Sequence, residues 1–336
     1  MRTTVARIAR EAGVSPATVD RALNNRDGVR PRTRDIVLQV AARLGYFGPA
    51  AQETPPRVRL AFVLPVGTNT FLHTLRRHLI EESQARGDCD VSIHQIESFE
   101  PARLADEVLS LRGTADAAGL VAPDHPEVRE AINTLANSGV KTCTMVSDIH
   151  TVKKVGYVGI DNRAAGRLAG LLLGRFLPAG DGEHRVALFM GSLAYRGHEE
   201  REMGFRSILA EEFRRITIAG HYEVSDDREL AYRATLRMLD AGEISAIYSI
   251  GAGNQGIARA LRERRLERRI VFIGHDLTDA TRIMLLDRTI DAVIEQNPKV
   301  QAREAIRLLV SAVNGKSEPD YPPRLQVIFR ENIPAI

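Results

Sequence analysis

The sequence predicts a mixed α/β protein in which a small all-α headpiece precedes a large domain with two doubly wound parallel sheets. Residues 1–48 show helical periodicity only, and residues 49–57 are rich in proline and alanine. From residue 58 onward, short continuous apolar runs alternate with amphipathic helical segments. Such alternation is typical of parallel strands covered on both faces. We therefore expect a headpiece at 1–48, a linker at 49–57 and a large domain at 58–336.

The headpiece is predicted to hold three helices. Apolar residues recur at helical spacing up to Gly13, which ends the first helix. A second helix begins almost at once, because Ser15 is a good N-cap and Pro16 is favoured at the first helical position. A third helix is expected over residues 31–44. Two short helices joined by a tight turn make a helix-turn-helix, whose second helix can enter the major groove of DNA.

Charge is unevenly distributed along the chain. Residues 1–48 contain nine basic and four acidic residues, a balance of +5. The rest of the chain contains 37 basic and 39 acidic residues, a balance of −2. A basic end on a slightly acidic body suggests that this end meets a polyanion, although a solvated basic surface would give the same numbers. Together with the helix-turn-helix, the charge favours a DNA-binding headpiece.

The spacing I-A-x-x-A-G-V-S-x-x-T-V-x-R-x-L-N, from Ile8 to Asn24, resembles the headpiece of the LacI/GalR (lactose-repressor) family of bacterial transcription regulators. The resemblance covers most of residues 3–48. It implies DNA contacts by the second helix and its flanks, at Thr4, Ser15, Pro16, Ala17, Thr18, Arg21 and Asn24. Arg21 has the strongest physical case for reading a base, because a guanidinium can bind guanine with two hydrogen bonds. A phosphate contact is the alternative for Arg21.

Two positions depart from the family pattern. Asp20 stands where a small hydroxyl residue is usual, and a carboxylate there would repel phosphate or accept a hydrogen bond from cytosine. In the family the linker often forms a hinge helix that inserts a leucine into the minor groove. This chain has Pro55 near the place of that leucine and Pro56 after it, which limits a linker helix to about two turns.

Ten apolar runs of the large domain are predicted strands: 58–65, 91–96, 117–123, 141–146, 155–161, 185–191, 216–224, 246–251, 270–276 and 291–296. Helical patterns such as 70–86 and 126–138 lie between them. Ten strands are more than one open sheet usually contains, and the repeated alternation of strands and helices suggests two similar halves. Ligands of such folds bind at the carboxyl ends of the strands.

The segment VGIDNRAAGRLAGLLL, residues 158–173, resembles the crossover between the halves in the same family and in the periplasmic sugar-binding proteins of the ribose type. The resemblance runs through residues 58–330 in many separate matches, and it implies a periplasmic-binding-protein-like fold. The first half would comprise residues 58–160 and 297–322. The second would comprise residues 162–295 and a final strand at 323–330, and the halves would hinge around a ligand cleft.

The same resemblance implies ligand contacts at or near the strand ends, by Asn69, Phe71, Asp124, Ser147, Asp148, Arg201, Asp226, Asn254, His275, Asp276 and Gln296. The ring of Phe71 suits the C–H face of a sugar, and a plain core role is its alternative. Asp276 is the strongest candidate, because a strand-end carboxylate can accept two hydroxyls; a helix N-cap ahead of Thr278 is its alternative. Departures from the ribose-type pattern at 146, 226 and 251–254 imply a ligand other than ribose or galactose, and the carboxylates and amides favour a sugar or polyol over a purine.

The sequence offers no catalytic or metal site. GIDNRAAG and GAGNQG lack the spacing of a dinucleotide-binding motif, and there is no P-loop, no G-x-S-x-G and no H-E-x-x-H. Cys89 and Cys143 form neither a metal-ligand pattern nor a disulfide framework. We therefore expect no enzyme, no metal and no cofactor. There is no apolar run long enough to cross a bilayer and no apolar core of a signal peptide, so the expected location is cytoplasmic, without membrane contact.

These observations favour a ligand-responsive transcription regulator, a repressor of a carbohydrate or polyol catabolic operon. Its operator affinity would change when a small molecule binds in the cleft. One headpiece reads too few base pairs for genomic specificity, so we expect a homodimer on palindromic double-stranded operator DNA. The first helix of each half is a candidate dimer interface. The alternatives are a solute-binding protein of a sugar transport system, which the headpiece disfavours, and a Rossmann-type enzyme, which the missing site disfavours.

Overall fold

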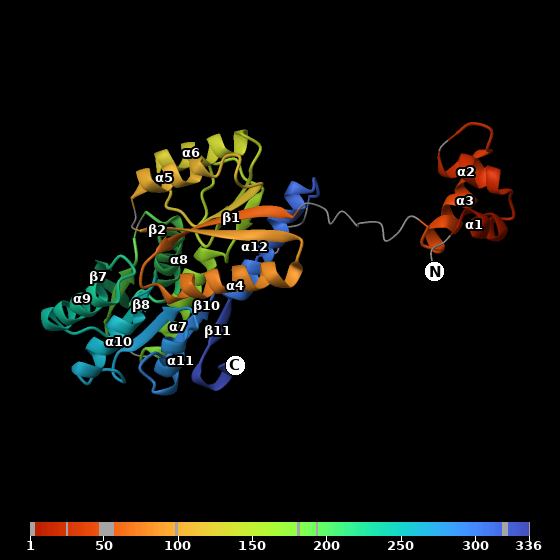
Figure 1. Cartoon of the computed structure of the whole chain (residues 1–336). Coiled ribbons are helices and arrows are strands. Elements are labelled where there is room, and N and C mark those ends of the chain that lie inside the picture. The colour runs from red at the N-terminus through yellow and green to blue at the C-terminus, as the bar shows by residue number, and fades with distance from the viewer. Residues whose placement is uncertain are drawn as a thin grey trace. The chain divides into compact units, whose positions relative to one another are not determined.

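The computed structural model describes residues 4–24, 26–46, 57–97, 100–179, 182–192, 194–317 and 322–335. The chain divides into two compact units, Met1–Pro56 and Arg57–Ile336 (Figure 1). The linker prolines Pro55 and Pro56, and with them the expected limit on a linker helix, lie outside the described residues.

The first unit is a three-helix headpiece: α1 Val5–Ala12, α2 Pro16–Leu23 and α3 Pro31–Arg43. Each helix contributes a fully buried side chain to one small core, namely Ile8, Val19 and Val37. Gly13 ends α1 at a φ of 67°, a left-handed conformation that glycine adopts at little cost. The chain can therefore turn directly into α2, and the helix-turn-helix expected from the sequence is confirmed.

The second unit begins with a parallel five-stranded sheet of order β2-β1-β3-β4-β5, which forms the first lobe. Its strands are β1 Val58–Val66, β2 Cys89–Glu97, β3 Ala117–Leu120, β4 Lys141–Met145 and β5 Gly156–Val158. One face is covered by α4 Thr70–Arg86 and α12 Pro298–Val313, and the other by α5 Pro101–Ser110 and α6 Pro126–Asn137. Alternate residues of β1 point to opposite faces, so Phe62 packs in the first cluster and Val63 in the second.

The second lobe is a six-stranded sheet of order β11-β10-β9-β8-β6-β7. Its strands are β6 His184–Met190, β7 Ile216–Glu223, β8 Ala246–Ser249, β9 Val271–His275, β10 Ala292–Glu295 and β11 Gln326–Ile328. One face is covered by α7 Asn162–Phe176 and α8 Arg196–Glu212, and the other by α9 Arg228–Ala241, α10 Asn254–Glu263 and α11 Asp279–Leu286. A short 3₁₀ helix, η1 Arg330–Asn332, follows β11.

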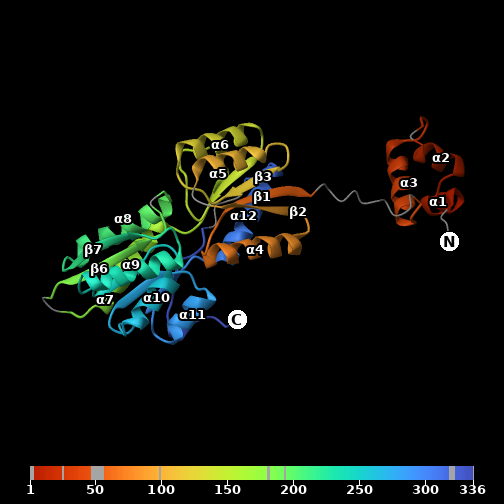
Figure 2. The ribbon, with the colours of Figure 1, turned by 60° about the vertical axis from the view of Figure 1, so that its left-hand side comes forward.

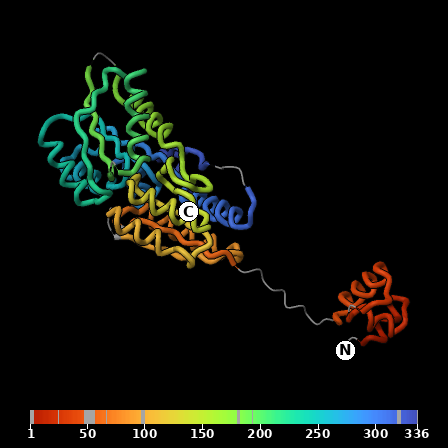
Figure 3. Tube along the Cα trace, turned by 90° about the horizontal axis from the view of Figure 1, so that it is seen from above, coloured from red at the N-terminus to blue at the C-terminus, as the bar shows by residue number. Residues whose placement is uncertain are grey.

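The chain passes between the lobes after β5, after β10 and again before β11. Figure 2 shows α7 to α11 at one end of the second unit and α4 to α6 at the other. The blue helix α12 lies with the orange and yellow segments of the first lobe, where it packs on α4 (Figure 3). Each lobe is thus completed by residues from late in the chain, as repeated crossing requires.

The expected fold class is confirmed, and the predicted strands agree with the observed ones to within a few residues at each end. β11 differs from its neighbours because it runs antiparallel to β10. Within the described ranges, no helix is both long and apolar enough to span a membrane.

Candidate functional site

The second helix of the headpiece presents several of its predicted DNA contacts to solvent. Pro16, Ala17 and Arg21 are exposed, whereas Val19 on the same helix is fully buried. Thr4 occupies the N-cap position of α1, but its side chain makes no cap hydrogen bond. The residues predicted to face a DNA groove are therefore those that the headpiece core leaves accessible.

Hydrogen bonds at both ends of α2 fix the other predicted DNA contacts. At the start of the helix, Ser15 Oγ accepts from the backbone N–H of Thr18 at 3.2 Å. At its end, Asn24 Nδ2 donates to the Asp20 carboxylate at 2.9 Å. The same carboxylate pairs with Arg26 at 3.3 Å. The unusual acid at position 20 is thus partly neutralised by Arg26, and it orients the amide of Asn24, one of the predicted DNA contacts.

The carboxyl ends of the strands in both lobes border one cleft of about 700 Å³, counting the space open to solvent. Seven of the eleven predicted ligand residues line it: Asn69, Phe71, Ser147, Arg201, Asp226, Asp276 and Gln296. Asn254 and His275 line an adjoining compartment of about 400 Å³, which shares Asp226 and Asp276 with the cleft. Parallel strands bring these residues together because their carboxyl ends meet at one edge of the sheet.

Arg201 is the buried centre of a polar network at the base of the cleft. Its Nε donates to Asn162 Oδ1 at 2.8 Å, its Nη1 to the carbonyl of Ile250 at 2.7 Å and its Nη2 to Gln296 Oε1 at 2.8 Å. Asn162 follows the first crossover and Gln296 lies in the second, so Arg201 connects two of the segments that join the lobes. Three of the five guanidinium N–H groups are thereby used by the protein.

Close packing of α7 on α8 holds Arg201 in place. A Cβ at Gly166 of α7 would overlap the carbonyl oxygen of Arg201, and a Cβ at Gly204 of α8 would overlap that of Arg163. Only glycine permits this approach of two helix backbones. The glycines that the sequence places in both helices therefore determine how far Arg201 reaches into the cleft.

Asp276 and Gln296 form the next part of the network. Gln296 Nε2 donates to Asp276 Oδ1 at 2.8 Å. Burial and the nearby charge of Glu295 raise the pKa of Asp276 to about 7, although Arg201 and Gln296 act in the opposite direction. Asp276 is not the helix N-cap that was its alternative role, because Thr278 caps α11 with its own side chain.

The lobes contact one another directly on both sides of the cleft. On one side Asp226 accepts a hydrogen bond from Asn69 Nδ2 at 2.9 Å, and its backbone carbonyl accepts one from Thr68 at 3.0 Å. On the other side Ser147 Oγ accepts from the backbone N–H of Gly197 at 3.0 Å. Asn69, Asp226 and Ser147 therefore belong to the contact between the lobes as well as to the lining of the cleft.

Backbone strain is concentrated in the lining of the cleft. Four of the seven non-glycine residues with positive φ in the described ranges lie there: Val146 at 65°, Ser225 at 48°, Asp226 at 53° and Asp276 at 69°. Each such conformation costs about 1–3 kcal/mol and persists only where the surroundings enforce it. Strain of this kind is typical of binding sites.

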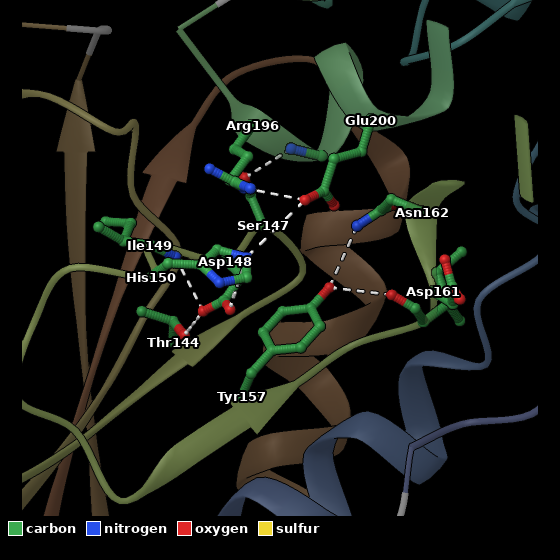
Figure 4. A network of polar contacts seen from close by, with 12 residues as sticks. Thr144, Ser147, Asp148, Ile149, His150, Tyr157, Asp161, Asn162, Arg196 and Glu200 are labelled. Carbon is green, nitrogen blue, oxygen red and sulfur yellow. Dashed lines mark hydrogen bonds and ion pairs between the residues drawn. The ribbon is translucent and has the colours of Figure 1, made fainter. Parts of the chain in front are cut away.

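Asp124 and Asp148 lie apart from the described lining of the cleft. Asp124 pairs with Arg129 in the first turn of α6. Asp148 pairs with Lys154. It also accepts a hydrogen bond from Thr144 Oγ1 at 2.6 Å (Figure 4). Burial alone raises the pKa of the Asp148 carboxyl, but the bonds from Lys154 and Thr144 hold it below its ordinary value. Asp148 is thus engaged within the first lobe.

Tyr157 and Asn162 extend the network around Arg201 toward the first lobe. Figure 4 shows the Tyr157 hydroxyl facing the Asn162 amide, and the two atoms are 3.2 Å apart. The same hydroxyl donates to the carbonyl of Val146, a residue that lines the cleft, at 3.0 Å.

Tyr195 and His198 also line the cleft, and neither was predicted from the sequence. His198 precedes Arg201 by three residues on α8, and helical spacing places the two on one face, so this signal was available. His198 Nδ1 lies 3.0 Å from the carbonyl of Ser192, and burial lowers the pKa of the imidazole. Phe71 lines the cleft and also belongs to the core of the first lobe, so its position is compatible with both of its predicted roles.

The described residues contain no cluster of three or more histidine, cysteine or acidic side chains placed to hold a metal ion. Their arrangement at the cleft offers hydrogen-bond acceptors and donors beside aromatic rings. Such a site can bind a small polar molecule between two lobes.

Comparison with known families agrees with this architecture. Residues 60–317 match the family described as periplasmic binding protein domain, and residues 4–48 match the lacI family of bacterial regulatory proteins. The HTH-type transcriptional regulator reg1 of Streptomyces lividans is 25% identical over 335 residues, which cover 95% of this chain and 92% of the relative. The regulator MalR of Streptomyces coelicolor gives the same values. The regulator GalS of Salmonella typhimurium is 56% identical over 43 residues, 13% of each chain.

Solved structures share the fold of the second unit. GanP, a glucose-galactose binding protein from Geobacillus stearothermophilus, superposes with a TM-score of 0.73 at 22% identity, over 83% of this chain and 99% of that one. A solute-binding protein from Burkholderia graminis in complex with D-arabinose gives a TM-score of 0.75 at 19% identity, over 82% and 96%. The chain therefore belongs to the lacI family of bacterial regulatory proteins: it is a ligand-responsive DNA-binding transcription regulator in which a helix-turn-helix headpiece precedes a periplasmic binding protein domain.

Proposed function

We propose that this regulator represses an operon for carbohydrate or polyol catabolism, and that a small polyhydroxylated effector binds in the cleft. The observation that supports this most is the cleft itself, to which both lobes contribute polar side chains, with Asn69 of one lobe bonded to Asp226 of the other. GanP and the Burkholderia protein are described as binding or holding monosaccharides, which supports the same class of ligand here. The relatives reg1 and MalR are regulators, and we infer that the cleft is a sensor and not a catalytic site.

An effector can change operator affinity only by binding one arrangement of the lobes more tightly than another. The hydrogen bonds of Asp226 with Asn69 and of Ser147 with Gly197 exist only while the lobes are close. A ligand that reinforces or replaces them shifts the angle between the lobes. In a homodimer paired through the first lobes, that shift would change the spacing of the two headpieces.

The regulator would act in the cytoplasm as a homodimer, with one headpiece on each half of a palindromic operator. Selection from random DNA duplexes with the full-length protein tests this part of the proposal. We expect a palindromic consensus and an affinity that falls steeply as salt is added, because phosphate contacts release counterions. Recovery of a single half-site, or of no consensus, would contradict it.

A further inference from the structure

Acidic groups outnumber cationic ones around the cleft. Asp226 and Asp276 line it, and Glu295 lies buried beside Asp276. Among the described residues, Arg201 is the only cationic side chain in the lining, and it is already bonded to Asn162, Gln296 and a backbone carbonyl. The adjoining compartment adds one exposed cation, Arg228.

The two carboxylates in the lining differ in what they can still accept. Asp226 accepts from the backbone N–H of Ala252 at 2.8 Å through Oδ1 and from Asn69 at 2.9 Å through Oδ2. Asp276 accepts from Gln296 through Oδ1, and its Oδ2 has no partner in the described part of the chain. The backbone of Asp276 is held at a φ of 69°, which costs strain energy, and one of its two carboxylate oxygens is still without a partner among the described residues. Asp276 is therefore the side chain best placed to receive a donor from a ligand.

Two aromatic side chains line the same cleft. Phe71 from the first lobe and Tyr195 from the second both line the cleft. Ring faces attract cations, and the attraction grows where water is excluded. His198 adds no positive charge, because burial lowers the pKa of its imidazole. Carboxylates, aromatic rings and a guanidinium that is already bonded make a site suited to a cation and unsuited to an anion.

We propose that the effector of this regulator is a small polyhydroxylated molecule that carries a protonated amine, and that Asp276 receives the amine. The proposal rests on the sensor function proposed above and specifies the charge of the ligand. An uncharged sugar could donate hydroxyls to Asp276, but a protonated amine would in addition be attracted by the acidic groups that outnumber the cations around the cleft. A phosphorylated or carboxylated sugar would bring further negative charge to Asp226 and Asp276 with no uncommitted cation in the described lining.

Matched ligands test this proposal on the full-length protein by calorimetry and thermal shift. The probes are glucosamine, galactosamine and mannosamine, each compared with its parent hexose, its N-acetyl derivative and its 6-phosphate. Tris and pentaerythritol form an acyclic pair, in which Tris carries an amine where pentaerythritol carries a fourth hydroxymethyl group. We expect at least one amine to bind about tenfold or more tightly than its uncharged partner, and its N-acetyl and phosphate derivatives to lose binding.

Asp276→Asn should abolish the preference for the amine. The new amide can still accept from Gln296, so the thermal midpoint should show that the variant folds. Asp240→Asn, which changes an exposed acid at the end of α9, is the matched control and should keep the preference.

Equal binding of amine and parent, tighter binding of a phosphate, no binding by any amine, or a preference that survives Asp276→Asn would each overturn the proposal. Operator affinity measured with the same probes separates this inference from the sensor function. If an uncharged or anionic probe changed operator affinity, the sensor function would stand, and the proposal that the effector carries a protonated amine would be wrong. An amine that binds through Asp276 without changing operator affinity would support the ligand class and contradict the sensor function.

Discussion

Arg21 projects from the exposed side of α2, opposite the buried Val19. A guanidinium in this place can form two hydrogen bonds with guanine, and a bidentate contact is worth about 1–3 kcal/mol of discrimination between bases. Arg21→Ala should therefore lose that amount of preference for operator over random DNA, as measured by fluorescence anisotropy. Arg43→Ala, which removes an exposed ion pair with Glu11, is the control and should leave discrimination unchanged. Equal weakening on both DNAs would make Arg21 a phosphate contact.

Asp276 should make the stability of the second unit depend on pH. Its pKa rises from 3.8 to about 7 on folding, because partial burial and the nearby charge of Glu295 disfavour the ionised form, with Asp226 adding repulsion against the attraction of Arg201. Between these values the folded protein holds a proton that the unfolded chain releases, so the free energy of unfolding should fall as pH rises from about 4 to about 7. Asp276→Asn should flatten this slope in urea titrations. An unchanged slope would show that other groups, such as Glu295, set the pH dependence.

At the level of helices and strands, the packing of α7 on α8 sets the position of Arg201. Gly166→Ala would force a methyl group against the backbone of Arg201, and overpacking of this kind costs typically about 1–3 kcal/mol. We expect that loss in urea unfolding, together with weaker effector binding. Gly182→Ala is the control, because a Cβ there meets open space. Normal stability in Gly166→Ala would mean that the helices can move apart without cost.

The helices and strands were predicted from the sequence more completely than any other feature. Continuous apolar runs predicted the buried strands, because a strand covered on both faces excludes polar residues along its length. The direction of β11 was not predictable, since an edge strand shows the same side-chain pattern in either direction. The glycines of α7 could be read from the sequence. Their packing partners on α8 could not be predicted, because they lie more than thirty residues away and no periodicity in the sequence links them.

The candidate site was predicted less completely than the fold. Family resemblance located the carboxylates at the strand ends, yet it could not show that Asp148 is paired with Lys154. Nor could it show that Asn69 binds Asp226, which lies 157 residues further along the chain. Whether a polar side chain faces a ligand or another side chain depends on these long-range contacts.

At the scale of the whole molecule, the bond between Asn69 and Asp226 opposes separation of the lobes. Asn69 also caps α4, and losing a cap costs about 1 kcal/mol. Asn69→Ser should keep the cap and lose the bond between the lobes, so small-angle scattering should show a more open second unit. Asn24→Ser, which removes an amide of the headpiece only, is the control. A second unit as closed as before would mean that the remaining contacts, of Thr68 with Asp226 and of Ser147 with Gly197, suffice.

Occupancy of the cleft is proposed to control the affinity of the headpieces for DNA. This coupling can be measured as the operator affinity of the full-length protein with and without a ligand that binds at Asp276, in parallel with Asp276→Asn. Coupling between sites typically amounts to about 1–3 kcal/mol, so we predict an operator affinity changed by about 5-fold to 150-fold in the native protein and unchanged in the variant. An operator affinity that stays the same while calorimetry shows the cleft to be saturated would mean that the cleft does not control DNA binding.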